Sequence, residues 1–273
     1  MTQPGLSEIP QEIIDEVIDR CSADKETLKA CSLTSRAWVY RTRKHLFATL
    51  KLTDKTLVAW CWVIVAPLPQ PDRPLTSSPY ASSWLPSCVT SLDLSSSYSR
   101  SSGIFEDALL RANTYLSAFI NLKTLTLSAV SLTTFSEASL TTSFGSLGKT
   151  VRKLELWKCS LGSRLFTFLK LFIHLESLEL DWNAWSYKNL PEPPRVSPED
   201  LPTLRGSLTI SRVTKEDDGL VNFLATARVE CHAITIGCGT TSAFSPFGAL
   251  FAKCGDHLRT LTLTVVPPMS FNG

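Results

Sequence analysis

Residues 143–150 (SFGSLGKT) end in the Gly-Lys-Thr sequence found in phosphate-binding loops. In those loops backbone N–H groups surround the phosphates, and the loop follows a strand and opens a helix at its lysine. Here Ser143 stands where the first glycine is required, and the segment leads into a run with strand-like alternation. These departures argue against a nucleotide site, and we expect no cofactor.

A cluster of thiols and imidazoles near the C-terminal end could be considered as a zinc site: Cys231, His232, Cys238, Cys254 and His257. Their spacing matches no standard zinc pattern, so buried thiols are favoured and no metal is expected. The chain also lacks a Gly-x-Ser-x-Gly elbow, and its histidines have no nearby nucleophile and carboxylate for a triad. We therefore expect no catalytic residue and no enzymatic activity. A hydrolase with a site assembled from residues far apart in the sequence is the less favoured alternative.

Charge and composition argue against two classes of partner. Lys and Arg number 27 against 25 Asp and Glu, so no strong overall field attracts nucleic acid or an anionic membrane. The longest apolar run, residues 57–68, has 12 residues, short of the ~20 that a membrane-spanning helix needs. The N-terminus shows no signal-peptide pattern, and the eight scattered cysteines indicate reduced core thiols. These features predict a protein of the cytoplasm or nucleus.

Two proline-rich segments divide the chain. Ten of the 16 prolines fall in residues 67–79 and 191–202, and both segments are predicted to be loops or linkers. The first separates a unit at residues 1–50 and a connector at 51–82, which contains the apolar run, from a larger domain at 83–273. The second is predicted to be an exposed insertion within that larger domain.

The N-terminal unit shows three helical patterns. Apolar residues recur at helical spacing, with acidic residues between them, at Ile9, Ile13, Ile14, Val17 and Ile18. A second helix is predicted to begin after Asp24 as its N-cap, and a third to span about residues 34–47. Three short helices make a very small core, and small cores usually need support from outside.

Four short motifs follow one another in this unit: IPQEII at residues 9–14, LKACSL at 28–33, RAW at 36–38 and HLF at 45–47. Their order resembles the F-box motif, in particular its fungal variants. Isoleucine replaces the usual leucine before the proline, and HLF replaces a tryptophan-containing end. The resemblance implies a three-helix unit that binds the Skp-type adaptor of a cullin-based ubiquitin ligase. The apolar surface that it implies for this contact includes Ile9, Pro10, Ile13, Ile14, Leu28, Leu33 and Trp38.

Beyond residue 83 the apolar pattern changes from helical to alternating. Pairs of the form apolar-x-apolar begin at residues 92, 125, 154, 178, 208, 234 and 261, at intervals of 24 to 33 residues. This interval is typical of leucine-rich repeats, in which each pair lies on a short parallel strand and points into a stacked core. Residues 104–112, 163–173 and 219–227 are compatible with helices between the strands. We therefore predict an α/β leucine-rich-repeat-like solenoid with a curved parallel sheet and irregular repeats.

Two repeats, at residues 151–161 and 175–185, fit the longer repeat template, with Cys159 and Asn183 predicted to cap backbone groups at the turn. Because side chains alternate along a strand, the residues beside the inward leucines point to the open face. This places on one surface Lys153, Glu155, Trp157, Lys158, Glu179, Asp181 and Trp182.

Stacking of these two repeats sets Glu155 about 5 Å from Glu179, a like-charge pair that costs stability unless a cation or basic partner offsets it. The equivalent positions in the other repeats are mostly threonine: Asp93, Thr126, Thr209, Thr235 and Thr262. We predict that a basic or aromatic segment of a target protein lies across the central repeats. The alternative interpretation is a solvated face without a partner.

Together these patterns predict a non-catalytic, substrate-recruiting adaptor of an SCF-type ubiquitin ligase. The helical unit would bind the Skp-type adaptor of the cullin complex, and the solenoid would bind an unknown protein target. A leucine-rich interaction or sensor protein without a ligase link is the main alternative. No polar capping unit follows the last strand pattern at residues 258–266, so truncation of the solenoid is also compatible with the sequence.

Overall fold

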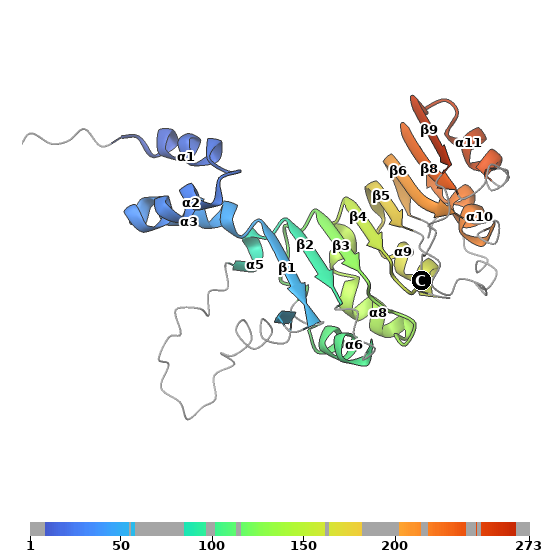
Figure 1. Cartoon of the computed structure of the whole chain (residues 1–273), viewed down its shortest axis with the longest axis horizontal. Coiled ribbons are helices and arrows are strands. Elements are labelled where there is room, and N and C mark those ends of the chain that lie inside the picture. The colour runs from blue at the N-terminus through green and yellow to red at the C-terminus, as the bar shows by residue number, and fades with distance from the viewer. Residues whose placement is uncertain are drawn as a thin grey trace, which may run out of the picture.

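The computed structural model describes residues 9–54, 56–57, 85–96, 102–112, 116–161, 164–181, 202–213, 218–238, 244 and 247–265. Three helices come first, and a parallel sheet accompanied by further helices follows, so the fold is α/β (Figure 1). The predictions for both proline-rich segments, apart from Pro202, lie outside the described residues. So do the predictions for Asn183, for Trp182 and for the apolar run beyond Leu57, which is itself buried.

The three predicted N-terminal helices are α1 (Gln11–Arg20), α2 (Lys25–Thr34) and α3 (Arg36–Leu46). Pro10 immediately precedes α1, where its missing N–H costs no helical hydrogen bond. Asp24 caps α2 as predicted, because its carboxylate accepts the N–H groups of Glu26 and Thr27, each at 3.1 Å. The third helix begins two residues later than predicted, since Ser35 is extended and accepts the N–H of Ala37.

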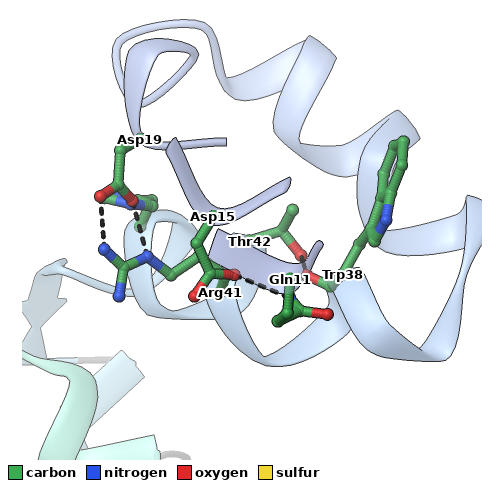
Figure 2. Close-up of polar contacts among 7 residues, drawn as sticks. Gln11, Asp15, Asp19, Trp38, Arg41 and Thr42 are labelled. Atoms are coloured by element: carbon green, nitrogen blue, oxygen red, sulfur yellow. Dashed lines mark hydrogen bonds and ion pairs between the residues drawn. The ribbon is translucent and has the colours of Figure 1, made fainter. Parts of the chain in front are cut away.

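The core of this helical unit is small. Among its described residues the fully buried side chains are Ile18, Leu28 and Thr42. The Thr42 hydroxyl donates to the carbonyl of Trp38 at 2.7 Å, so its polar atom is satisfied within α3 (Figure 2). The unit therefore depends on few buried contacts.

In the part of the chain that the structure describes, nine strands form one parallel sheet in the order β1-β2-β3-β4-β5-β6-β8-β9, with β7 paired to β6. All seven predicted apolar-x-apolar pairs lie on strands. The strands are β1 (Thr49–Thr53), β2 (Ser91–Ser95), β3 (Thr124–Ser128), β4 (Lys153–Trp157), β5 (His174–Asp181), β6 (Thr203–Val213), β7 (Arg228–Val229), β8 (Ala233–Cys238) and β9 (Thr260–Val265).

Strand β1 corrects the predicted domain boundaries. Its residues were assigned to the end of the helical unit and to the connector, but β1 pairs in parallel with β2, with Leu50 opposite Leu92 and Leu52 opposite Leu94. The physical reason is that TLKLT has the same apolar-x-apolar alternation as the later strands. The sheet therefore begins at Thr49, three residues after α3 ends.

Helices α6, α8, α9, α10 and α11 lie along one side of the sheet, and the other side faces away from them (Figure 1). The predicted helices at 104–112, 163–173 and 219–227 are confirmed as α6 (Ser102–Arg111), α9 (Arg164–Lys170) and α10 (Asp218–Thr226). Two short helices and one 3-10 turn were not predicted before strands β4 and β9: α8 (Glu137–Phe144), η1 (Leu147–Lys149) and α11 (Gly248–Cys254). A further short helix, α5 (Leu85–Cys88), precedes β2.

The core lies between the sheet and these helices. In β3 and β4 the leucines Leu125, Leu127, Leu154 and Leu156 are buried, and the residues between them are partly exposed. Phenylalanines from the helix side fill the space opposite, with Phe168 in edge contact with Phe144 and Phe172 at 5.1 Å between ring centroids. Burial of each such side chain contributes about 1.5–3 kcal/mol before entropy is counted. The predicted direction of the leucines is confirmed.

Cys159 shows how the turn after β4 is satisfied. Its thiol donates to the carbonyl of Leu127 on the neighbouring strand, at 3.2 Å between sulfur and oxygen. The thiol thus caps a backbone carbonyl of the neighbouring strand β3, and burial raises the pKa of the thiol to about 12, so it stays protonated and able to donate.

The last strand, β9, differs from the others because all its residues are exposed. Leu261 and Leu263 continue the buried row of Ile234 and Ile236 on β8, yet each remains nearly half exposed. Within the described residues no strand pairs with the outer edge of β9. The row of leucines thus ends on an open edge.

Candidate functional site

An exposed apolar stripe runs along α1 and the residues just before it, and it consists of Ile9, Ile13 and Val17. These side chains are 63%, 50% and 54% exposed, and their four-residue spacing places them on one side of the helical segment. Ile18 points the other way and is buried against the remaining helices. Two of the three exposed apolar side chains lie on α1 itself, and Ile9 lies two residues before its first residue.

A surface hollow of about 220 Å³ lies beside the apolar stripe. The described residues that line it are Ile13, Glu16, Val17 and Arg20, with Arg20 paired to Glu16 at 2.5 Å. The apolar stripe with a charged rim has the composition of a protein-binding surface rather than of a catalytic pocket.

The structure brings only part of the predicted adaptor-binding set to the surface. Ile9, Pro10 and Ile13 are exposed, Ile14 and Trp38 are partly exposed, and Leu33 at the end of α2 is 88% exposed. Leu28 corrects the prediction, because it is fully buried and fills the core of the helical unit. Val17 was not among the predicted contact residues, although its position four residues after Ile13 signalled it.

A charged network holds α1 against α3. Asp19 accepts two hydrogen bonds from the guanidinium of Arg41 and lies 2.7 Å from Nε2 of His45 (Figure 2). The hydrogen bonds from Arg41, followed by that from His45, hold the pKa of the Asp19 carboxyl well below its usual range. This network orients α1, and therefore its apolar stripe, relative to the other two helices.

The second candidate surface is the open face of the sheet at β4 and β5. The register pairs Glu155 with Glu179 and Trp157 with Asp181, and all four residues are partly exposed between buried leucines. The predicted like-charge pair is therefore present. The predicted threonine ladder is also present, because Asp93, Thr126, Thr209, Thr235 and Thr262 occupy equivalent register positions.

The negative charge of Glu155 is offset by hydrogen-bond donors from neighbouring side chains of the same chain. Lys153 reaches its Oε1 at 2.5 Å, and Thr126 and the Trp157 indole donate to its Oε2 at 2.9 and 3.5 Å. Burial alone would raise the pKa of Glu155, but the hydrogen bonds from Lys153 and Thr126 outweigh it and lower that pKa. Glu155 thus stays ionised beside Glu179.

Glu179 has the opposite environment. Burial, and then the charges of Glu155 and Asp181, raise its pKa above the usual value, and Lys153 offsets only part of this. Asp181 is more deeply placed, and its Oδ1 is buried without a hydrogen-bond partner among the described residues. Arg212 approaches that oxygen to 4.0 Å, from a position where β6 bulges and the backbone has a φ of 63°.

The remaining predicted target residues fall in two groups. Lys158 is exposed in the turn after β4, at a φ of 54°, so it does not share the strand position of Lys153 and Trp157. Trp182 lies outside the described residues. Lys51 was not predicted, because β1 was not; it stands beside Asp93 in the register and 3.7 Å from its carboxylate.

The nucleotide and zinc alternatives gain no structural support. Residues 143–150 begin in the last two residues of α8, include η1 and lead towards β4, whereas a phosphate loop follows a strand and opens a helix. Gly148 is needed for another reason, since a Cβ there would lie 1.8 Å from the carbonyl oxygen of Leu171. Cys231, Cys238 and Cys254 are buried, as the thiol interpretation predicted, and burial raises the pKa of Cys231 to about 12.

Comparison of the chain with models of known protein families and with curated protein sequences found no match. Among the described residues, every helix is too short or too polar to cross a lipid bilayer.

Proposed function

We propose that the chain is a non-catalytic substrate-recruiting adaptor of an SCF-type ubiquitin ligase, acting in the cytoplasm or nucleus. The observation that carries the proposal is the exposed apolar stripe of Ile9, Ile13 and Val17 on a helical unit with three fully buried side chains. Such a unit gains stability when a partner covers its apolar surface. The F-box resemblance of residues 8–50 names that partner as the Skp-type adaptor.

The sheet supplies the second half of the proposed function. Its strand spacing, parallel register and capping thiol at Cys159 support a leucine-rich-repeat solenoid whose open face binds a target protein. Predicted contact residues on that face are Lys153, Glu155, Trp157, Glu179 and Asp181, together with Trp182 and Lys158 beside them. Two binding surfaces on one scaffold would then hold a target lysine near a ubiquitin-charged enzyme, by raising its effective concentration.

The adaptor contact is tested by co-purification with a Skp-type adaptor. The double variant Ile13→Ala, Val17→Ala removes the centre of the apolar stripe, and we expect at least about a tenfold loss of adaptor affinity. Both side chains are exposed in the free chain, so the variant should stay folded. Ile173→Ala is the matched control, because Ile173 is also an exposed isoleucine, at 44%, but lies before β5.

Adaptor binding that is equal in the double variant and the control would contradict the ligase proposal. The same holds if the wild-type chain, correctly folded, binds no Skp-type adaptor at all. The interaction or sensor role would then be preferred, since it requires the open face of the sheet and makes no use of the apolar stripe.

A further inference from the structure

We propose that the open face between β4 and β5 binds the guanidinium group of an arginine side chain in an extended segment of the target. The arginine site consists of Trp157, Glu179 and Asp181. This inference rests on the proposed function, because it names the side chain by which that face would hold its target. It also goes further, since it selects a guanidinium over an aromatic or lysine side chain.

The three residues occupy three corners of a rectangle on the sheet. Trp157 and Asp181 are register partners on adjacent strands, so their backbones lie about 5 Å apart. Glu179 stands two residues before Asp181 on the same strand and the same face, about 7 Å along it. Glu155 is the fourth corner. A planar group held between the two carboxylates of β5 therefore lies beside the indole of Trp157.

Glu155 is already occupied and does not act as the receptor. Three donors of the chain, from Lys153, Thr126 and Trp157, share its two oxygens. Glu179 differs, because no hydrogen bond from another described residue contributes to its pKa, which burial and its acidic neighbours raise. Of the two facing glutamates, Glu179 on β5 is thus the one whose carboxylate can still accept hydrogen bonds from a ligand.

Asp181 provides an independent sign that a cation is missing. Its side chain is only 9% exposed, and its buried Oδ1 has no hydrogen-bond partner in the described part of the chain. A buried carboxylate oxygen that accepts no hydrogen bond costs free energy, which a bound donor would recover. Arg212 stays 4.0 Å away, beyond hydrogen-bond distance. Among the described residues, two cations, Lys153 and Arg212, face three carboxylates, so the described part of the site has one negative charge left over.

Guanidinium fits these groups better than other cations do. Its planar fork donates to carboxylates through two parallel hydrogen bonds and stacks on aromatic rings, whereas an ammonium is a compact and strongly hydrated point charge. A metal ion needs several converging ligands. Among the described residues, no group of three His, Cys, Asp or Glu side chains is placed to hold one.

The experiment titrates the full chain with the peptide acetyl-Ser-Gly-Arg-Gly-Ser-amide. Binding is followed by the ¹⁵N-indole signal of Trp157, which a Trp157→Phe spectrum assigns. Two matched peptides replace the arginine by lysine or by citrulline, its neutral isostere. We expect the citrulline peptide to bind at least about tenfold more weakly, because the charge-assisted hydrogen bonds are lost, and the lysine peptide to fall in between.

Variants of the chain locate the contact. Glu179→Gln and Asp181→Asn should each weaken the arginine peptide about tenfold, and Arg212→Gln should tighten it severalfold by removing the competing cation. Glu176→Gln is the matched control, since Glu176 is exposed on the same strand outside the site. Glu179→Gln removes a like-charge neighbour of Glu155, so that variant is expected to fold even if Asp181→Asn does not.

Equal affinity for the arginine and citrulline peptides, or an arginine peptide that leaves the Trp157 signal unmoved, overturns the proposal. A lysine peptide that binds as tightly as the arginine peptide overturns the choice of guanidinium, and a folded Glu179→Gln chain of unchanged affinity overturns the location. None of these readouts involves the Skp-type adaptor. Failure of adaptor co-purification with intact peptide binding therefore contradicts the ligase proposal alone, and the converse result contradicts the arginine site alone.

Discussion

The helical unit and the sheet bury their apolar side chains to very different degrees. The helical unit fully buries Ile18, Leu28 and Thr42 and leaves the apolar stripe in solvent, whereas the sheet buries a continuous row of leucines and isoleucines from β2 to β8. Charge is also distributed differently, because Asp19 is neutralised by Arg41 and His45 while Asp181 has a buried oxygen without a hydrogen bond. In the helical unit, apolar side chains are left exposed to solvent, whereas in the sheet a buried carboxylate oxygen is left without a hydrogen bond. The two proposed binding surfaces thus differ in chemistry.

The largest expected effect is on the free energy of unfolding, when a buried leucine of the sheet and an exposed isoleucine of α1 are each replaced by alanine. Leu154→Ala removes a fully buried side chain and should lower the free energy of unfolding by ~2–5 kcal/mol. Ile13→Ala removes an exposed one and should change it by less than about 0.5 kcal/mol. Urea denaturation followed by tryptophan fluorescence measures both. Similar losses for the two variants would show that the apolar stripe is covered within the chain itself.

Acid should weaken the helical unit before the sheet. The pKa of Asp19 lies below its ordinary value of 3.8 in the folded chain, so its stabilising contribution is present above that pH and is lost as the pH falls through the range below. Hydrogen exchange measured between pH 5 and pH 2 should therefore show α1 losing protection first. Asp19→Asn should show weak α1 protection already at pH 5, and Asp15→Asn, one turn earlier on α1, is the matched control. Equal protection of α1 in Asp19→Asn and wild type would contradict the role of the network.

In the sheet, acid should have a smaller and opposite effect on stability, because Glu179 stabilises the fold when it is protonated. The pKa of Glu179 is raised above its ordinary value of 4.5, so protonation stabilises the fold below that pH, and this contribution is lost as the pH rises through the folded-state pKa. Glu179→Gln should therefore raise the free energy of unfolding at pH 7 by up to about 1 kcal/mol. Chemical denaturation of the variant, with Glu176→Gln alongside, measures this. A destabilised Glu179→Gln chain would mean that the carboxylate has a favourable partner in the free protein.

Seven of the nine described strands were predicted because alternation is a local pattern, and β1 and β7 were missed. Each apolar-x-apolar pair specifies both the strand and the face that is buried, so the Glu155–Glu179 pairing followed from the sequence alone. Helices α8 and α11 were missed, since serines and threonines in one and a glycine start in the other give weak helical patterns. The inward direction of Leu28 on α2 follows from its helical pattern, which conflicts with its place in the adaptor-binding set that the resemblance implies.

Arg212 shows a different limit of the sequence. Simple alternation along β6 cannot predict that its guanidinium approaches Asp181, because the bulge between Ile210 and Val213 shifts the register at that point. The donors around Glu155 are easier to foresee, since Lys153 and Trp157 stand two residues away on the same face. The alternating pattern thus predicts contacts between residues of the same strand. It does not predict a contact such as that of Arg212 with Asp181, which depends on a bulge in the neighbouring strand.

Among the described residues, the outer edge of β9 is unpaired and carries partly exposed apolar side chains. Leu261, Leu263 and Val265 stand partly in water beside backbone groups that, among the described residues, no further strand pairs. Edges of this kind recruit other strands, so intact molecules should self-associate end to end as a solution is concentrated, without unfolding first. Leu263→Lys would place a charge on this edge and disfavour pairing with another strand. Light scattering should then report monomers at concentrations where the wild-type protein self-associates.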